Sequence, residues 1–211
     1  MDKGKIDAFW SGRTAIADPR LATNYRDDGR LEIDFKLVSA FAHQGDRILD
    51  LGAGGCTLAC KLLPLATEVV AVDKYAGFLK KAPAHMQLTP VCCDVVDYFD
   101  NSQYDEILLF GVANFLTDEE LYKLCQNATG MLAPQGTFIA KHQCGIDQEV
   151  IVDRFSEELG CHYHARYPSV KSQENLFSEF FCVEVLDVYP PDLNRWPDTH
   201  FYAFICTPRN K

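Results

Sequence analysis

Short apolar runs separated by polar turns predict a protein in which strands and helices alternate. Two segments, 56–65 and 118–131, space their apolar residues at helical intervals. Other runs are short and rich in branched side chains, as is typical of buried strands: 47–51, 68–73, 86–95, 104–110 and 137–141. This order favours a parallel sheet covered by helices.

The C-terminal part has a different pattern. Residues 147–160 have one apolar face at helical spacing, with Gly160 as the expected stop, and 161–178 show no regular pattern. The runs 180–189 and 200–206 predict two strands, and the proline-rich stretch between them predicts an antiparallel hairpin.

The residues before the first strand are expected to form a cap. Residues 33–43 have the spacing of a helix that packs on the sheet, whereas 9–30 combine aromatic residues and arginines without clear periodicity. Such a segment suits a lid that faces a substrate, and Tyr25 and Arg26 are candidate substrate-binding residues. A solvated cap anchored by Trp10 and Tyr25 is the alternative. We expect one domain, 1–211, with a cap (1–44) and a catalytic core (45–211).

The glycine-rich turn after residue 51 is the most informative motif. Asp50 closes an apolar run and is followed by Gly52, Gly54 and Gly55, after which a helix is expected. Glycines let the backbone turn sharply and approach a ligand, and the helix start offers unpaired N–H groups. A dinucleotide fingerprint would have its third glycine at Thr57.

The motif Asp-Leu-Gly-Ala-Gly at residues 50–54 resembles the first motif of class I S-adenosylmethionine (SAM)-dependent methyltransferases. The chain departs from that motif at Cys56, where the family usually has a glycine, and adds Gly55 before it. Later segments match the family in the same order: the acidic strand end at Asp73, the Asp94-Val95 pair, the Tyr-Asp start of 104–110, and the Leu-x-Pro-x-Gly turn before 137. The resemblance extends over residues 46–141.

The resemblance implies a Rossmann-like α/β fold with a seven-stranded, mostly parallel sheet of order 3-2-1-4-5-7-6, strand 7 antiparallel and helices on both faces. It also implies SAM as the cofactor and S-adenosylhomocysteine (SAH) as its product. The implied cofactor-binding residues are Asp50, Gly52, Ala53, Gly54, Asp73, Lys74, Asp94, Val95, Phe110 and Gly111.

Two of these carboxylates have simpler alternative roles. Asp73 lies 19 residues after Gly54, where α/β nucleotide-binding folds place a ribose-binding carboxylate, but a solvated strand-end aspartate is the alternative. The resemblance places Asp94 opposite the adenine amino group. A plain helix N-cap is its competing role, and the two roles are compatible.

Methyl transfer to an alcohol needs a general base, and His142 is the candidate. It directly follows the expected strand 137–141 and has an ordinary pKa suited to proton transfer. A strand-end histidine bonded to a nearby loop is the alternative. Asn114, after the fourth strand, can orient a substrate or bind the cofactor amino group, or it can stabilise its own loop.

Further candidate substrate contacts follow the fifth strand: His164, Tyr167 and His200. His162 and His164 face the same side if their segment is extended. A metal would need a third ligand such as His200 or Asp147, and we expect no metal site. Tyr167 and Trp196 can stack on a flat ligand or pack the hairpin. Candidate methyl acceptors are the oxygen and nitrogen atoms of a small molecule such as a sugar or secondary-metabolite intermediate.

The composition of the chain limits the kinds of partner that the protein is expected to bind. The chain has 211 residues, 47% of them hydrophobic and 24% charged, and a net charge of −10, which argues against a nucleic-acid surface. Its nine cysteines form no C-x-x-C pair, and no apolar run has the length of a signal peptide or membrane span. We therefore expect a cytoplasmic protein without membrane contact, and its oligomeric state is not predicted.

Two other functions compete with the methyltransferase. A nicotinamide-dependent oxidoreductase can use a similar sheet, but it would normally have the missing third glycine. A non-catalytic SAM sensor or partner subunit is the other alternative, which the irregular glycine motif at Cys56 leaves open. The carboxylates Asp50, Asp73 and Asp94 predict that SAM binds in either case.

Overall fold

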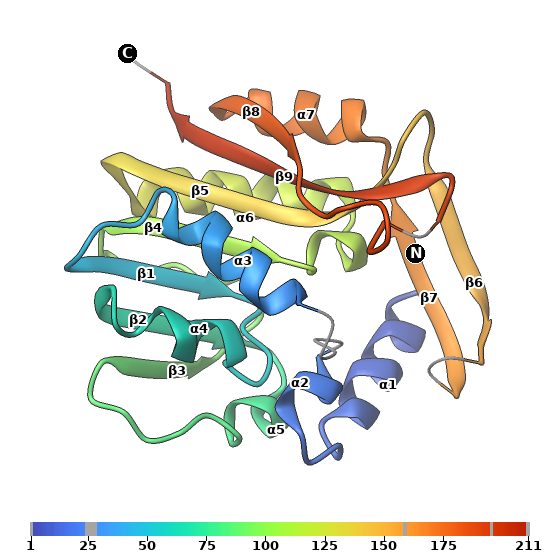
Figure 1. Ribbon diagram of the computed structural model, residues 1–211, viewed down its shortest axis with the longest axis horizontal. Helices are drawn as coiled ribbons and strands as arrows, with labels where there is room; N and C mark the ends of the chain where they lie inside the picture. Colours follow the sequence, from blue (N-terminus) through green and yellow to red (C-terminus); the bar gives the residue numbers. More distant parts are fainter. Residues whose placement is uncertain (1, 24–28, 158–159, 195, 210–211) are drawn as a thin grey trace.

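Seven strands form one twisted sheet, and Figure 1 shows them lying side by side across the view. The computed structural model describes residues 2–23, 29–157, 160–194 and 196–209. The strand order is β3-β2-β1-β4-β5-β9-β8. The bounds are β1 (Asp46–Leu51), β2 (Ala66–Asp73), β3 (Leu88–Cys92), β4 (Tyr104–Phe110), β5 (Leu132–Gly145), β8 (Phe181–Asp187) and β9 (Thr199–Pro208).

The first five strands are parallel, and β9 lies antiparallel between β5 and β8. Taken as the sixth and seventh strands of the sheet, β8 and β9 reproduce the expected order 3-2-1-4-5-7-6 with strand 7 reversed. The predicted fold class and the predicted terminal hairpin are therefore confirmed.

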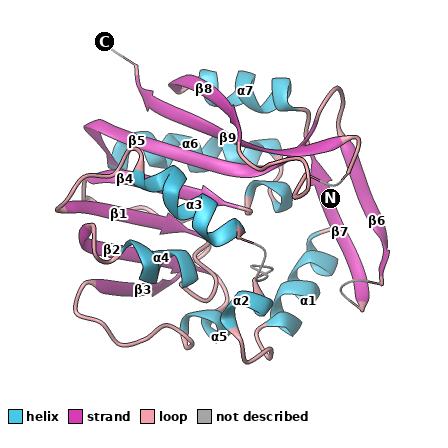
Figure 2. Cartoon of the chain, in the orientation of Figure 1, coloured by secondary structure: helices cyan, strands magenta, loops and turns pink. Residues whose placement is uncertain are grey.

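Helices cover both faces of the sheet (Figure 2). One face carries α3 (Arg30–Ser39) and α4 (Thr57–Leu62), and the other carries α6 (Asp118–Met131) and α7 (Val170–Ser178). Strand periodicity explains this division, because successive side chains point to opposite faces. In β1, Leu49 and Leu51 pack with Leu124 of α6, whereas Ile48 packs with the α3 and α4 side.

The start of α6 forms as its sequence predicts. The Glu120 N–H donates to Thr117 Oγ1 at 3.2 Å, and the Thr117 N–H donates to Glu120 Oε2 at 2.7 Å. This capping box satisfies two backbone donors that a helix start would otherwise leave unpaired. It also fixes the loop after β4, because Glu120 forms an ion pair with Lys3 of the N-terminal segment.

The predicted helix over 147–160 is wrong, and 161–178 is more regular than expected. Residues 147–160 contain the strand β6 (Val150–Ser156). Residues 161–178 contain β7 (Cys161–Tyr167), which pairs antiparallel with β6, and the helix α7. Its three consecutive branched residues, Val150, Ile151 and Val152, suit a strand, and their helical spacing was coincidental. The β6–β7 hairpin lies beyond the carboxyl ends of the parallel strands (Figure 1).

The N-terminal segment is helical where no periodicity was found. It consists of α1 (Lys3–Arg13) and α2 (Pro19–Ala22), both at the carboxyl edge of the sheet, beside the short α5 (Ala76–Leu79) and a 3₁₀ turn, η1 (Ala113–Phe115) (Figure 1). Aspartates begin both helices: Asp2 accepts from the Lys5 N–H and Asp18 from the Arg20 N–H. Lys81 Nζ donates to the carbonyls of Thr14 and Ile16 at 2.6 Å, which attaches this segment to α5.

Within the described residues, no helix combines the length and apolar character needed to cross a bilayer.

Candidate active site

The glycine turn after β1 is tightly enclosed. Gly52 and Gly54 have φ values of 87° and 53°, which side chains other than glycine rarely adopt. A Cβ on Gly52 would lie 2.1 Å from Val112 Cγ2, and one on Gly54 would lie 2.4 Å from Thr23 Cγ2. Both conformation and space therefore require glycine, because the loop after β4 and the N-terminal segment cover the turn.

The carboxylate that ends β2 holds this turn in place. Asp73 accepts the Gly54 N–H at 2.9 Å and the Tyr75 N–H at 2.8 Å, one at each carboxylate oxygen. The N–H groups of Gly52 and Ala53 donate to the Val72 carbonyl at 2.8 and 2.9 Å. The ends of β1 and β2 are thus joined by hydrogen bonds, and Asp73 still has free lone pairs for a ligand.

Asp94 begins a turn after β3. Its Oδ1 accepts the Val96 N–H at 3.1 Å, but no helix follows, so the helix N-cap alternative is wrong. Lys74 lies between Asp94 and Asp7 of α1, with Nζ at 3.4 and 2.9 Å from their carboxylates. This chain of charges connects the N-terminal segment to the ends of β2 and β3.

A cavity of about 360 Å³ opens above the glycine turn, and we call it the glycine-turn cavity. Its charged lining is predominantly acidic: Lys3 and Lys74 against Asp7, Asp50, Asp73, Asp94 and Glu120. Trp10, Phe78 and Phe115 add aromatic surface. The cavity therefore suits a ligand with an aromatic ring and positive charge.

Asp50 is the least stabilised carboxylate of the site. It is only 3% exposed, and no described residue donates a hydrogen bond to it. Burial, and secondarily the nearby Asp73, raise the pKa of Asp50 to about 7. Burial also raises the pKa of Asp73, although the hydrogen bonds from Tyr75 and Gly54 oppose this shift. A cationic ligand would relieve both penalties.

A second cavity, of about 630 Å³, lies under the β6–β7 hairpin, and we call it the hairpin cavity. Val150, Val152 and Arg154 of β6 face it, as alternate residues of a strand must. Tyr163 and Tyr167 of β7 complete this wall.

Lys141 lies at the base of the hairpin cavity. It is 5% exposed, pairs with the fully buried Asp34 of α3, and donates to the Tyr189 hydroxyl at 2.6 Å. Tyr189 donates in turn to Asp34 at 2.9 Å. A buried charge needs such partners, so the network holds the ammonium group at a fixed position.

The two cavities meet. They share the lining residues Trp10, Thr23, Phe110, Gly111 and Phe115. The Gly111 N–H donates to the Lys141 carbonyl at 2.7 Å, which fixes this junction to β5. A ligand in one cavity can therefore contact a ligand in the other.

Comparison with known proteins agrees with this geometry. Residues 48–136 match the model of a family described as a methyltransferase domain. The Rossmann-like sheet, with its reversed seventh strand and glycine turn, is the class I architecture that the motifs implied. The chain therefore contains a methyltransferase domain within a class I fold. The predicted methyltransferase class is confirmed, and solved structures with the same fold include complexes with SAH and with SAM.

Several proteins are similar to this methyltransferase. N-terminal Xaa-Pro-Lys N-methyltransferase 1-B of Xenopus laevis is 28% identical over 165 residues, which span 71% of this chain and 74% of that protein. A SAM-dependent methyltransferase from Leishmania major superimposes with a TM-score of 0.74 at 21% identity, covering 97% of this chain and 82% of that one. The DhpI–SAH complex gives 0.73 at 17% identity and covers 97% and 95%.

A third solved structure resembles this methyltransferase over its entire length. The 1,6-didemethyltoxoflavin-N1-methyltransferase of Burkholderia thailandensis, which holds its acceptor and SAH, gives a TM-score of 0.73 at 14% identity. It covers 100% of this chain and 92% of its own. At such identities these structures establish the shared fold.

All the residues expected to bind the cofactor line the glycine-turn cavity: Asp50, Gly52, Ala53, Gly54, Asp73, Lys74, Asp94, Val95, Phe110 and Gly111. Among the expected substrate contacts, Asn114 and Tyr167 line the hairpin cavity. Asn114 also stabilises the loop, because Nδ2 donates to the carbonyls of Gln143 and Arg166 at 2.7 and 3.0 Å. Tyr25 and Arg26 lie outside the described residues.

His142 does not lie in either cavity, contrary to expectation. The strand β5 continues to Gly145, so His142 lies within it and shares its core-facing side with Phe138. The imidazole is fully buried, stacks on Phe204 with ring centres 5.3 Å apart, and burial lowers its pKa to about 4. It cannot reach a substrate as a general base.

His164 and His200 also lie away from the cavities. His164 Nε2 accepts the Asp2 N–H at 3.2 Å, and its Nδ1 lies 3.5 Å from Asp153. His200 Nδ1 lies 3.1 Å from an Asp187 oxygen. Both histidines connect structural elements, so their expected substrate contacts are not supported.

The sequence analysis missed most of the hairpin wall and the buried network around Lys141. Alternation of Val150, Val152 and Arg154 could have indicated one strand face, but it spans too few residues to outweigh the helical spacing. Tyr189 and Asp34 are 155 residues apart and carry no common motif, so only the fold brings them together.

The buried Asp50 makes stability depend on pH. The pKa of Asp50 is about 7 in the folded protein and about 3.9 in the unfolded chain. The stability that protonated Asp50 contributes is therefore fully present below pH 4 and is lost as the pH rises to 7. The free energy of unfolding of Asp50→Asn, relative to that of wild type, should rise by about 2–3 kcal/mol from pH 5 to pH 7.5, because only the wild type has to bury the charge. Urea unfolding of both proteins at the two pH values measures this difference.

The exposed Asp192→Asn is the matched control and should follow wild type at both pH values. Parallel pH dependences of Asp50→Asn and wild type would contradict the proposed burial effect.

Proposed function

We propose that SAM binds in the glycine-turn cavity and that its methyl group is transferred to an oxygen or nitrogen of a small molecule held in the hairpin cavity. The observation that carries this proposal is the junction of the two cavities at Phe110, Gly111 and Phe115. Displacement at a methyl group requires nucleophile, carbon and sulfur in one line, and two cavities that meet end to end allow this arrangement.

The lining of the glycine-turn cavity fits the parts of SAM. We assign the ribose hydroxyls to Asp73, whose remaining lone pairs can accept two charge-assisted hydrogen bonds. Asp94 and Val95 lie farther along the same edge and are assigned to the adenine ring. Asp50, buried without a donor among the described residues, is assigned to the ammonium group of the methionine portion.

Charge supports the same assignment. SAM carries a sulfonium and an ammonium group against one carboxylate, and the described lining of the cavity has more carboxylates than lysines. Opposite charges attract more strongly inside a protein than in water. The cavity should therefore favour SAM, whereas loss of the sulfonium charge in SAH weakens the attraction and helps product release.

The reaction itself is a displacement. A lone pair of the acceptor atom forms a bond to the methyl carbon while the carbon–sulfur bond breaks, and the electron pair of that bond remains on sulfur as the thioether of SAH. The proton that the acceptor O–H or N–H group loses is released to solvent. The chain's contribution is to hold the two reactants in line and to exclude water. Burial raises the pKa of Tyr163 well above its ordinary value, so this phenol stays protonated and does not act as the base.

The hairpin cavity supports a small acceptor. Its volume of about 630 Å³ lies within the range of roughly 300–1,000 Å³ found for small-molecule sites. The β6–β7 hairpin forms one wall of this cavity, which includes Val152 and Tyr163. An N-terminal peptide is the competing acceptor, because the Xenopus laevis relative is named for that activity.

We also propose that residues 1–44 act as a cover for both ligands. Trp10 and Thr23 line both cavities, and ion pairs of Lys3 with Glu120 and of Asp7 with Lys74 hold α1 over the glycine turn. Exchange of the cofactor would then require these contacts to open.

A cytoplasmic location remains part of the proposal. The described cysteines are unpaired thiols, as expected in a reducing compartment.

Asp73→Asn tests the cofactor assignment. The amide can keep the Gly54 hydrogen bond but loses the charge-assisted bonds to ribose, so SAM affinity should fall roughly 10- to 100-fold. Calorimetric titration with SAM measures the change. Asp192→Asn, in the exposed turn between β8 and β9, should bind as wild type does. Unchanged affinity in Asp73→Asn would contradict the assignment.

Val152→Trp tests the acceptor assignment. The larger side chain should fill part of the hairpin cavity and abolish methyl transfer while SAM affinity stays within about twofold of wild type. The control is Ile151→Trp on the opposite, exposed side of β6, which should remain active.

Methyl transfer is measured by SAH release with a small-molecule acceptor panel and, separately, an Xaa-Pro-Lys peptide. Turnover of the peptide alone would overturn the small-molecule proposal but leave the SAM site intact.

A further inference from the structure

A second cluster of polar side chains lies at the opposite end of the sheet from the two cavities. It consists of His43, in the loop between α3 and β1, Asp46, the first residue of β1, and Glu106, near the start of β4. The strands β1 and β4 are adjacent and parallel, with Ile48 opposite Glu106. Asp46, two residues before Ile48, therefore faces the same side of the sheet as Glu106.

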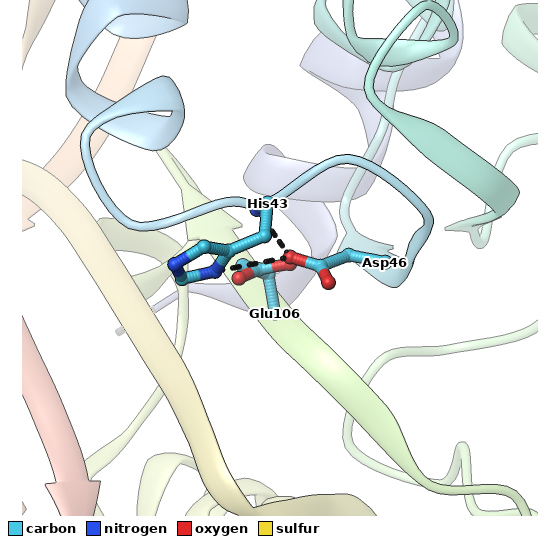
Figure 3. Close-up of side chains that lie close together, drawn as sticks. All are labelled: His43, Asp46 and Glu106. Carbon is cyan, nitrogen blue, oxygen red and sulfur yellow. Dashed lines mark hydrogen bonds and ion pairs between the residues drawn. The ribbon is translucent and has the colours of Figure 1, made fainter.

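Glu106 is the unusual member of this cluster. Its side chain is 2% exposed, and no described N–H or O–H group donates to its buried Oε2. A carboxylate oxygen removed from water requires a partner, either a donor, a proton or a cation. The Asp46 carboxylate lies beside it, within 4.8 Å, and two carboxylates repel each other unless a positive charge or a proton lies between them (Figure 3).

The other two side chains are turned toward Glu106. One ligand atom each of His43, Asp46 and Glu106 lies within 4.8 Å of the other two, and Figure 3 shows the imidazole and both carboxylates facing a common point. His43 Nδ1 lies 3.7 Å from Asp46 Oδ2, and the His43 N–H donates to the same carboxylate, which holds the loop next to β1.

We propose that His43, Asp46 and Glu106 form a binding site for one divalent transition-metal ion of the zinc type. One imidazole nitrogen and two carboxylate oxygens match the ligands that zinc accepts, whereas calcium and magnesium prefer oxygen ligands alone. The ion would supply the positive charge that the buried Glu106 oxygen lacks. Water would complete its coordination, because the His43 side chain is 87% exposed and leaves an open entry.

A modest local rearrangement brings the ligands to bonding distance. Ligand atoms of a tetrahedral zinc site are roughly 3.4 Å apart, for bonds of about 2.0–2.1 Å. The exposed His43 imidazole can rotate toward the two carboxylates without displacing core residues. The neighbouring carboxylate of Asp105 accepts the Arg47 N–H at 2.9 Å and remains outside the set.

Such a site would be structural. It connects the loop after α3 and the start of β1 to β4, and it lies at the amino-terminal ends of these strands, whereas both cavities lie beyond their carboxyl ends. The ion should therefore raise thermal stability and leave the affinity for SAM unchanged.

Zinc titration of the purified full chain tests the site. We expect one Zn²⁺ per chain at this cluster, a rise in melting temperature on saturation, and at least about tenfold weaker binding in His43→Ala and in Glu106→Gln. Glu106→Gln preserves the shape of the buried side chain, and His43 is exposed, so both variants should fold. Anomalous diffraction at the zinc edge from crystals grown with zinc should locate the ion between the three side chains.

His162→Ala is the matched control, because His162 and His164 both approach Asp153, within 3.5 Å, and form the other histidine-rich group described. This variant should keep the stabilisation by zinc. The proposal is overturned if zinc stabilises His43→Ala and Glu106→Gln as much as wild type, or if zinc has no effect on wild type. In the second outcome, a Glu106→Gln variant more stable than wild type would indicate that Glu106 and Asp46 share a proton.

Discussion

The close packing around the glycine turn after β1 is the constraint on which the active site depends. Val112 from the loop after β4 and Thr23 from the N-terminal segment occupy the space that side chains at Gly52 and Gly54 would need. Asp73 fixes the same turn through the Gly54 N–H. Three parts of the chain therefore converge where β1 ends, and their convergence creates a cavity bounded by backbone and carboxylates.

The same convergence has an electrostatic cost. Asp50 and Asp73 are buried side by side, and burial raises the pKa of both carboxyls. A buried carboxylate needs a partner, and no described residue donates a hydrogen bond to Asp50, so this residue lowers the stability of the folded protein. A positively charged ligand would supply the missing partner. Stability and binding are thus opposed at this residue, as is common in functional sites.

The proposed acceptor site is formed by a different part of the molecule. The walls of the hairpin cavity come from β6 and β7, which are not part of the central sheet, and its base comes from Lys141 with its partners Asp34 and Tyr189. Substitutions in β6 and β7 can therefore alter the proposed acceptor site without altering the proposed cofactor site. The junction at Gly111 couples the two, because its N–H is bonded to the carbonyl of Lys141.

Local patterns in the sequence were sufficient for the sheet and the glycine turn. Asp50, Gly52 and Asp73 could be assigned because strand ends and glycine turns have short-range signatures. The β6–β7 hairpin could not be predicted, because Val150, Ile151 and Phe155 fit a helical spacing equally well. His142 was misplaced because the fifth strand was expected to end at Lys141. The strand β5 continues to Gly145 through its pairing with β9, so His142 lies inside the strand and faces the core.

A crystal structure of the protein with SAH would show whether the cofactor and the acceptor meet where the two cavities join. We expect adenosine beside Asp73, Asp94 and Val95, and the thioether sulfur at the junction near Phe110, Gly111 and Phe115, directed into the hairpin cavity. SAH bound outside the glycine-turn cavity, or bound there with its sulfur directed away from the hairpin cavity, would contradict the proposed arrangement.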